Sequence, residues 1–339
     1  TKVTNSMLVQ PVNRNLIING AMQVAQRGTS FDHDIVFGSY TVDRMKVEIY
    51  TSNWSAATGG ASSQTSITDT FNETVNFTKA LRLTPSSEWT RGHLLQRIED
   101  VEFLSAKTVT VSFWARVDTG TLTLSDSNGT GDMRFDQNFG GGVASIHEVN
   151  PDITISTSWQ KFSITHTFAS TSDKTIDVSS YVSVTILNDV DLSSVGWLEI
   201  TGFQLEVGDT ATPFEYRSYG DELARCQRYY YQRDYKINNY QPVKFPCWNS
   251  SVKLMTGEFV HPVPMRAKPS VSNNGVGNFR VNMSQGNDEP CVGISLMGTN
   301  KNETFLSFEK STSDLTIGEC GYINTQENNA AALYFDAEL

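Results

Sequence analysis

Residues 196–231 constrain the fold of this chain more than any other stretch. Apolar and polar residues alternate there as in a β-strand, and the alternation changes phase after Gly202. A glycine inside a strand often marks a β-bulge, which shifts the phase by one residue. Ser218, followed three residues later by Asp221, has the spacing of a capping box and predicts the start of a helix. Residues on both sides of this helix have strand-like patterns, so we expect a helix between two β-rich domains.

The remaining sequence favours short strands separated by turns. The clearest strand pattern covers residues 109–117, where Phe113 and its alternate neighbours would point inward while Trp114 and Arg116 point outward. Residues 15–24 form a first strand in this interpretation. Many short strands with frequent turn residues and little helix predict an antiparallel β-sandwich. After the helix the pattern recurs on a smaller scale, which predicts a smaller C-terminal β-sandwich-like domain.

The chain is long enough for two domains with separate cores, because it has 339 residues. We divide it into an N-terminal arm or linker at residues 1–14, a sandwich domain at 15–217, a linker helix at 218–234 and a C-terminal β-domain at 235–339. No internal repeat and no heptad run is visible, which argues against a parallel β-helix and a coiled-coil stalk.

Charge restricts the partners of this chain. The formal net charge is −11, with 26 Lys and Arg against 37 Asp and Glu. Nucleic acids and anionic membranes are bound mainly through Lys and Arg, so we expect neither as a partner. No apolar run approaches 18 residues, so we expect no membrane insertion, and the polar N-terminus does not have the pattern of a signal peptide.

The four cysteines are not spaced for metal binding. They are Cys226, Cys247, Cys291 and Cys320, and none forms a CxxC pair. We therefore expect mostly buried thiols rather than a zinc site, with disulfides as the alternative.

No catalytic motif is visible, and we expect the protein not to be an enzyme. The sequence contains no GxSxG, P-loop, HExxH or GxGxxG pattern. A glycosidase needs two facing carboxylates. The dense acidic groups are Asp32, Asp34, Glu99, Asp100 and Glu102, which we interpret as solvated strand ends.

Aromatic residues give the most useful chemical signal. Sugar rings stack their C–H faces on Trp and Tyr. Trp54, Trp89 and Trp248 lie in polar segments that are predicted to be loops, and they are our candidates for carbohydrate binding. Trp114 would face outward from a core strand, which favours a contact between subunits over a ligand site.

Three segments together resemble one family. They are NLIINGAMQVAQRGTS with YTVDRM near the start, QLEVGDTATPFEYRS followed by CQRYY in the middle, and FVHPVPMRAKPSV with YFDAEL near the end. The chain resembles bacteriophage tail-fibre and related virion-appendage proteins that contain a jelly-roll domain like that of carbohydrate-binding modules. The resemblance covers roughly residues 15–339.

The resemblance implies a phage virion protein that attaches to the host cell surface through glycans or an outer-membrane receptor. It also implies other virion proteins as partners and a homotrimer, which the outward Trp114 and the tyrosines at 229–231 favour as well. We expect the C-terminal domain, about residues 235–339, to form the exposed tip, because loops at the end of a rigid scaffold carry recognition. A structural calcium ion beside the first and last strands is implied as well, near Asn19, Gly20 and Glu206. Two alternatives stay open: a purely structural head-fibre, decoration or adaptor protein, and a polysaccharide depolymerase.

Overall fold

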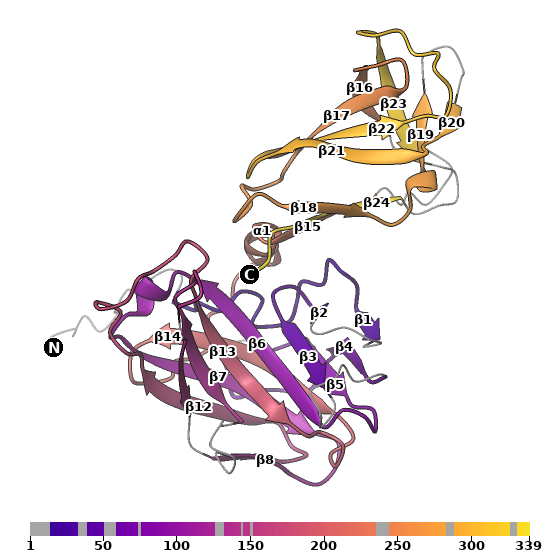
Figure 1. Ribbon diagram of the computed structural model, residues 1–339. Coiled ribbons are helices and arrows are strands. Elements are labelled where there is room, and N and C mark those ends of the chain that lie inside the picture. Colours follow the sequence, from indigo (N-terminus) through magenta and orange to yellow (C-terminus); the bar gives the residue numbers. More distant parts are fainter. Residues whose placement is uncertain are drawn as a thin grey trace, which may run out of the picture. The chain divides into compact units, whose positions relative to one another are not determined.

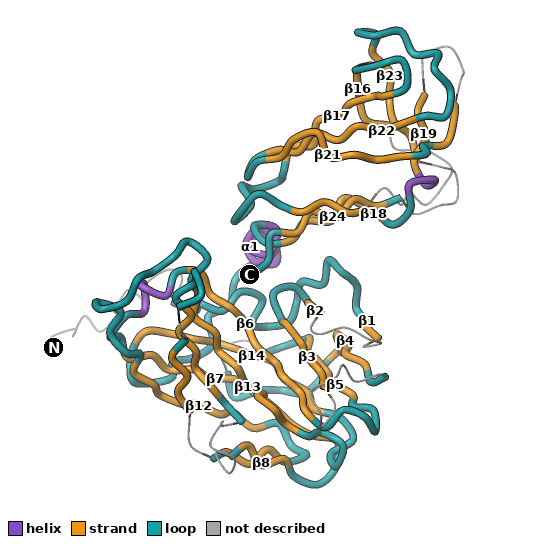
Figure 2. Tube along the Cα trace, viewed as in Figure 1, coloured by secondary structure: helices purple, strands orange, loops and turns teal. Residues whose placement is uncertain are grey.

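The computed structural model describes residues 14–32, 39–50, 59–73, 76–125, 132–143, 145–149, 152–234, 244–282, 288–325 and 331–339. The chain forms two compact units: residues up to 222 together with Leu339, and residues 223–338. Strands make up almost all of the regular structure in both units (Figures 1 and 2).

The first unit contains two six-stranded sheets. One has the order β1 (Ser30–Asp32), β4 (Ala61–Ser66), β5 (Lys79–Thr84), β14 (Leu198–Val207), β7 (Thr108–Val117) and β12 (Gln160–Thr167). The other has the order β10 (Ile146–Val149), β9 (Arg134–Asn138), β13 (Tyr181–Val190), β6 (Arg91–Glu99), β3 (Lys46–Tyr50) and β2 (Ser39–Tyr40). β8 (Leu122–Leu124) pairs with β11 (Ile153–Ile155), and a short 3-10 helix, η1, covers Val101–Leu104.

We call these the β7 sheet and the β13 sheet, and together they form the predicted antiparallel jelly roll. The chain crosses repeatedly between them, as in the successive strands β5, β6 and β7 and again in β12, β13 and β14. The core lies between the sheets and includes the predicted inward residues of β7, which are fully or almost fully buried: Val109, Val111, Phe113, Ala115 and Val117. The alternation in the sequence therefore identified the buried face of this strand correctly.

The predicted β-bulge is present in β14. The register between β14 and β7 shifts between Thr201 and Gln204, and Gly202 has φ +62°. A Cβ atom at Gly202 would lie 2.6 Å from the Phe77 ring, so both the backbone conformation and the packing require glycine there.

The helix begins where the capping box predicts and ends earlier than expected. In α1 (Tyr219–Gln227), Ser218 Oγ accepts a hydrogen bond from the backbone N–H of Asp221 at 3.2 Å. The predicted helix to residue 234 is wrong, because β15 (Tyr230–Asp234) follows and pairs with β24 (Ala332–Asp336). Hydrogen bonding to a strand about a hundred residues later decides this segment, and local periodicity does not show it.

The second unit is the predicted smaller sandwich. A three-stranded sheet of β15, β24 and β18 (Ser270–Asn273) faces a seven-stranded sheet across a core that includes Phe259, Phe308 and Phe335. The seven-stranded sheet has the order β20 (Asp288–Pro290), β19 (Phe279–Asn282), β23 (Cys320–Thr325), β16 (Lys244–Asn249), β17 (Leu254–Val260), β22 (Glu303–Glu309) and β21 (Gly293–Thr299). A second 3-10 helix, η2, covers Val276–Asn278.

The cysteines are thiols, as expected. Cys226, Cys247 and Cys291 are buried, Cys320 is exposed, and none of the four forms a disulfide. Burial raises the pKa of Cys247 and of Cys291 to about 12, so both stay protonated at neutral pH. Within the described ranges, no helix has the length and apolar character needed to cross a membrane.

Candidate functional site

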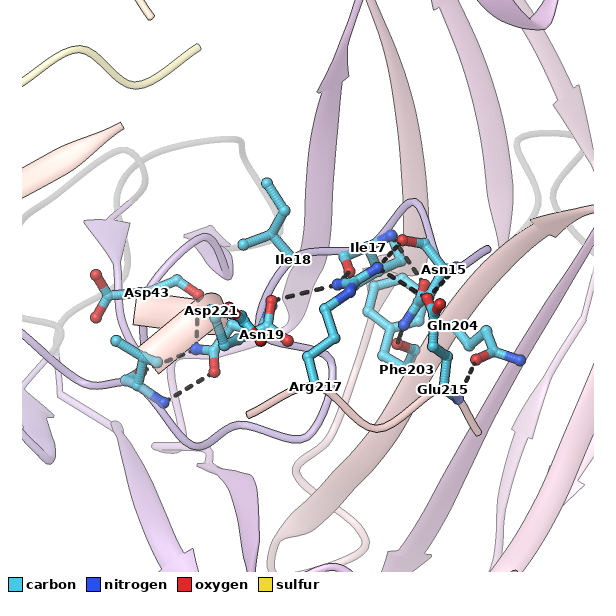
Figure 3. A network of polar contacts seen from close by, with 12 residues as sticks. Asn15, Ile17, Ile18, Asn19, Asp43, Phe203, Gln204, Glu215, Arg217 and Asp221 are labelled. Carbon is cyan, nitrogen blue, oxygen red and sulfur yellow. Dashed lines mark hydrogen bonds and ion pairs between the residues drawn. The ribbon is translucent and has the colours of Figure 1, made fainter. Parts of the chain in front are cut away.

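Residues of the two segments NLIINGAMQVAQRGTS and QLEVGDTATPFEYRS form a buried polar network in the first unit (Figure 3). Asn15 Oδ1 accepts the backbone N–H groups of Ile17 and Leu205 at 2.9 and 3.0 Å, and its Nδ2 donates to the carbonyl of Phe203 at 3.2 Å. Arg217 donates to the carbonyls of Asn15 and Ile17. The side chains of Asn15 and Arg217 therefore hold this segment, together with two backbone hydrogen bonds to β14, from Leu16 N–H to the Leu205 carbonyl at 2.8 Å and from Phe203 N–H to the Gly20 carbonyl at 2.9 Å. The strand predicted at residues 15–24 is wrong, because these separate bonds do not make a strand ladder.

A second amide extends the network. Asn19 has φ +61°, a left-handed conformation that asparagine tolerates better than most residues. Its side chain donates to the carbonyls of Val24 and Asp43 at 2.8 and 2.9 Å, and its backbone N–H donates to Glu222 at 2.8 Å. Asn15, Asn19 and Arg217 thus hold residues 15–24 against β14 and the start of α1, which is a structural role.

The three residues expected beside a calcium ion already have partners within the chain. Asn19 Oδ1 accepts the N–H of Val24, while the Glu206 carboxylate accepts from Thr212 and lies 3.1 Å from Arg14. A Cβ atom at Gly20 would lie 2.0 Å from the Phe203 carbonyl oxygen, so this glycine permits close packing. Across the described part of the chain, no three His, Cys, Asp or Glu side chains gather to hold a metal ion, and the calcium prediction gains no support.

The three candidate tryptophans occupy different environments. Trp54 lies outside the described residues. Trp89 lies in the predicted loop, between β5 and β6, but its ring is fully buried against Gly60 and Gly92 and offers no exposed face to a sugar. Trp248 lies in strand β16 rather than a loop, and its side chain is 41% exposed, so it stays a candidate.

Trp114 faces outward from β7, as expected, but the same chain covers it. Phe71 packs edge-on against the Trp114 ring, with 5.1 Å between ring centroids. Phe71, Phe77 and Phe214 form a separate apolar cluster over this face of the sheet, with Trp114 and Trp159 packed against it. Trp114 therefore needs no second subunit to cover it.

The outer face of the β13 sheet carries a groove of about 230 Å³. Five adjacent strands supply its lining: β10 with His147, β9 with Arg134, Asp136 and Asn138, β13 with Tyr181, Ser183 and Thr185, β6 with His93, Leu95 and Arg97, and β3 with Glu48 and Tyr50. Ser145, just before β10, completes it. All these strands lie in one sheet, so the groove crosses them.

The strand register places side chains from four strands in one row. His147 is opposite Asp136, Asp136 is opposite Ser183, and Ser183 is opposite Arg97. With strands about 4.8 Å apart, this row is about 14 Å long. Asp136 and Ser183 are 7% and 3% exposed although they point away from the core, so they form the floor of a depression.

Opposite charges are paired along the groove. The Asp136 carboxylate lies 2.8 Å from Arg134 and 2.5 Å from His147 Nδ1, and the Glu48 carboxylate lies 2.6 Å from Lys46. Burial alone would raise the pKa of Glu48, but the hydrogen bond and charge of Lys46 outweigh it and lower that pKa. The groove therefore presents fixed donors and acceptors rather than a net charge of one sign.

Two tyrosines contribute partly exposed aromatic surface. The guanidinium of Arg97 lies over the Tyr181 ring, 4.5 Å from its centroid. The Tyr50 ring packs edge-on against His93 at 5.5 Å, and burial lowers the pKa of His93, so this imidazole stays neutral at physiological pH. Aromatic surface beside oriented polar groups is suited to a sugar, whose rings have apolar faces and polar edges.

The groove is not evident in the sequence, because its aromatic residues are tyrosines in strands rather than tryptophans in polar loops. The signal is in the outward positions of three strands, where HLLQR, RFDQN and YVSVT place His, Arg, Asp or Tyr opposite inward apolar residues. Exposed strand faces usually carry polar residues, so this pattern does not reveal a groove until the strands are paired.

No protein-family model matches this chain, and no curated protein matches its sequence. Similar solved structures include the enzymatically active domain of tailspike protein 4 from bacteriophage CBA120, with 12% identity over 57% of this chain and 22% of that chain, and a TM-score of 0.33. They also include the xylan-binding domain CBM22-1 of Paenibacillus barcinonensis Xyn10C, with 12% identity, 58% and 96% coverage and a TM-score of 0.30. A CBM4 structure gives 14% identity, 56% and 98% coverage and a TM-score of 0.32. At these values the similarity assigns no ligand and no residue role to this chain.

Proposed function

We propose that the groove on the β13 sheet binds a bacterial cell-surface glycan, and that the protein is a non-enzymatic phage virion appendage, such as a tail fibre, that attaches to the host. The observation that carries this proposal is the groove itself. It combines two partly exposed tyrosine rings with a floor of fixed polar groups, among them Asp136 and Ser183.

The polar groups of the groove are held in place before any ligand arrives. Asp136 is fixed by Arg134 and His147, and Glu48 is fixed by Lys46 and the Tyr50 hydroxyl. Binding then costs little side-chain entropy, which favours recognition of sugar hydroxyls. Many copies on one virion would add avidity to a weak single site.

The carboxylates of the groove are poorly placed for hydrolysis. Glu48 on β3 and Asp136 on β9 are separated by β6 and β13. Three strand spacings are about 14 Å, whereas glycosidases place their two carboxylates within about 9.5 Å. Both groups are also engaged in ion pairs. This arrangement supports binding over a depolymerase activity.

The virion location and the homotrimer rest on the resemblance of the sequence to phage appendage proteins. Trp114 no longer supports the trimer, because Phe71 covers it within one chain. Light scattering of the purified protein tests the trimer, and a mass near 37.6 kDa, that of one chain, would contradict it.

The test of glycan binding is a Tyr181→Ala variant assayed on purified host lipopolysaccharide and capsule. We expect its affinity to fall about tenfold, since a stacking ring contributes about 0.5–1.5 kcal/mol beyond its buried area. Tyr216→Ala is the matched control, because Tyr216 is 52% exposed and does not line the groove. Equal binding by both variants would refute the groove as the site.

The same preparation separates the rival functions. Reducing ends are counted before and after incubation with the polysaccharide, and an increase that disappears in Asp136→Asn would establish a depolymerase. Absence of binding to every host glycan, in a protein that still incorporates into virions, would favour a purely structural component.

A further inference from the structure

The second unit has an aromatic pair on the outer face of its seven-stranded sheet. Trp248 on β16 is 41% exposed, and the Phe305 ring on β22 lies 6.4 Å from it, edge-on. β17 lies between these two strands, and Figure 1 shows the three side by side. The core of the unit is on the opposite face, where Phe259 and Phe308 are fully buried.

Hydroxyl groups extend across the sheet from the tryptophan. Trp248 is opposite Thr256, Thr256 is opposite Ser307, and Ser307 is opposite Ser295. Ser307 is 1% exposed, and among the described residues its Oγ has no hydrogen-bond partner. A buried hydroxyl without a partner costs free energy, so a ligand that reaches it gains a hydrogen bond at a prepared position.

Two carboxyl groups and an open space adjoin the Phe305 ring. Glu258 is directly opposite Phe305, and Glu303 precedes Phe305 by two positions on the same face. A hydrogen bond between the two carboxyl groups raises the pKa of Glu258. On the other side, Gly298 is opposite Phe305, and no atom lies within 4 Å of the position that a Cβ would occupy there.

We propose that this surface, which we call the Trp248 face and define by Trp248, Phe305, Glu258, Glu303 and Ser307, is a second glycan-binding site. Trp248 and Phe305 offer ring surface to the apolar face of a sugar. Ser307 and the carboxyl pair offer partners to its hydroxyls. The inference is independent of the groove in the first unit, because no residue is shared.

The chemistry of the Trp248 face favours a glycan over other ligands. Two carboxyl groups beside the rings disfavour nucleic acids and anionic lipids, which need cationic partners. The centres of protein interfaces are depleted of charged residues, whereas here Glu258 and Glu303 adjoin Phe305 directly. A sugar fits both the rings and the carboxyl groups, because its apolar face stacks on a ring and its hydroxyls donate hydrogen bonds to carboxylates.

The experiment uses the full chain on an array of purified bacterial lipopolysaccharides and capsular polysaccharides. The first protein is Tyr181→Ala, in which the groove is impaired, and the second adds Trp248→Ala. Some array signals should survive in Tyr181→Ala. We expect these signals to fall about tenfold when Trp248→Ala is added, because one stacking ring is lost. Trp248→Phe should restore part of the signal, and Glu258→Gln should weaken it less than Trp248→Ala.

Ile317→Ala is the matched control, since Ile317 is 65% exposed in the same unit and lies outside the Trp248 face. Thermal unfolding checks that each variant folds. The inference is overturned if, in the Tyr181→Ala protein, adding Trp248→Ala changes binding no more than adding Ile317→Ala. It is also overturned if no signal survives in Tyr181→Ala itself. It is also overturned if Trp248→Ala lowers the oligomeric mass in light scattering, because the face is then a contact between copies.

Discussion

The two outer faces of the first unit differ, although both belong to one sandwich. On the β7 sheet, the outer face is covered by Phe71, Phe77 and Phe214, which pack over Trp114. On the β13 sheet, the outer face has no such cover among the described residues and holds the polar groove instead. The alternation of residues along a strand thus identifies an outer face, while the rest of the chain decides whether that face is available to a ligand.

The covered face also holds a buried ion network. Glu199 is 1% exposed and lies 2.8 Å from both Arg82 and Arg116. The two guanidinium groups lie over the Trp197 ring, 4.2 and 5.5 Å from its centroid. Charged and aromatic residues are therefore paired with one another on both faces, but the β7 sheet also carries the apolar cluster of Phe71, Phe77 and Phe214 over its outer side. We expect stability to depend on the covered face and binding on the open one.

The largest expected effect is that of Phe77→Ala on stability. Phe77 is 3% exposed and packs edge-on against Phe71 and Phe214. Loss of a buried phenylalanine costs about 3–5 kcal/mol, which denaturant unfolding measures directly. Phe103→Ala is the control, because Phe103 is 46% exposed. A small effect of Phe77→Ala would show that the cover is not part of the core.

The next effect is that of Glu199→Gln. The substitution removes the charge that compensates Arg82 and Arg116, whose side chains are 32% and 24% exposed. Because both arginines are partly solvated, we expect a loss of about 2 kcal/mol rather than the larger cost of a fully buried pair. Urea unfolding of Glu199→Gln beside the exposed control Glu102→Gln measures the difference, and equal stabilities would contradict the buried network.

A smaller effect concerns pH. Burial lowers the pKa of His166 from 6.5 to about 4, and its ring stacks on Phe135 at 4.5 Å. Between these two pH values the unfolded chain binds a proton that the folded chain does not, so stability falls as the pH drops from 6.5 to about 4. Since His166 is only partly buried, we expect a loss of less than about 2 kcal/mol.

Unfolding of the wild type and of His166→Phe across this pH range isolates the contribution of the imidazole. The wild type should lose more stability than the variant as the pH falls. If the free energy of unfolding changed with pH equally in the wild type and in His166→Phe, the imidazole at the edge of the core would already be solvated in the folded state.

The smallest expected effect on stability is that of Asp136→Asn in the groove. The partners of Asp136 are themselves partly exposed, with Arg134 at 27% and His147 at 53%. Such pairs contribute about 1 kcal/mol or less to folding. Glycan affinity measured by calorimetry should nevertheless fall. If Asp136→Asn lowered stability but not glycan affinity, the outer face of the β13 sheet would contribute to folding rather than to binding.

Several features of this chain follow from local sequence. The phase change at Gly202 predicted the bulge in β14, and the spacing of Ser218 and Asp221 predicted the start of α1. The inward residues of β7 were also predicted correctly. In each case the signal lies within a few residues, because side-chain direction and capping depend on the local backbone.

Only the tertiary structure decided which faces are open. Trp89 is buried because Gly60 and Gly92 allow its ring to pack against their backbones, and Trp114 is covered by Phe71 from another part of the chain. The groove joins side chains from five strands whose order in the sheet differs from their order in the sequence. Alternation determines on which side of a strand a residue lies, but long-range packing determines what lies above it, and no local pattern records that packing.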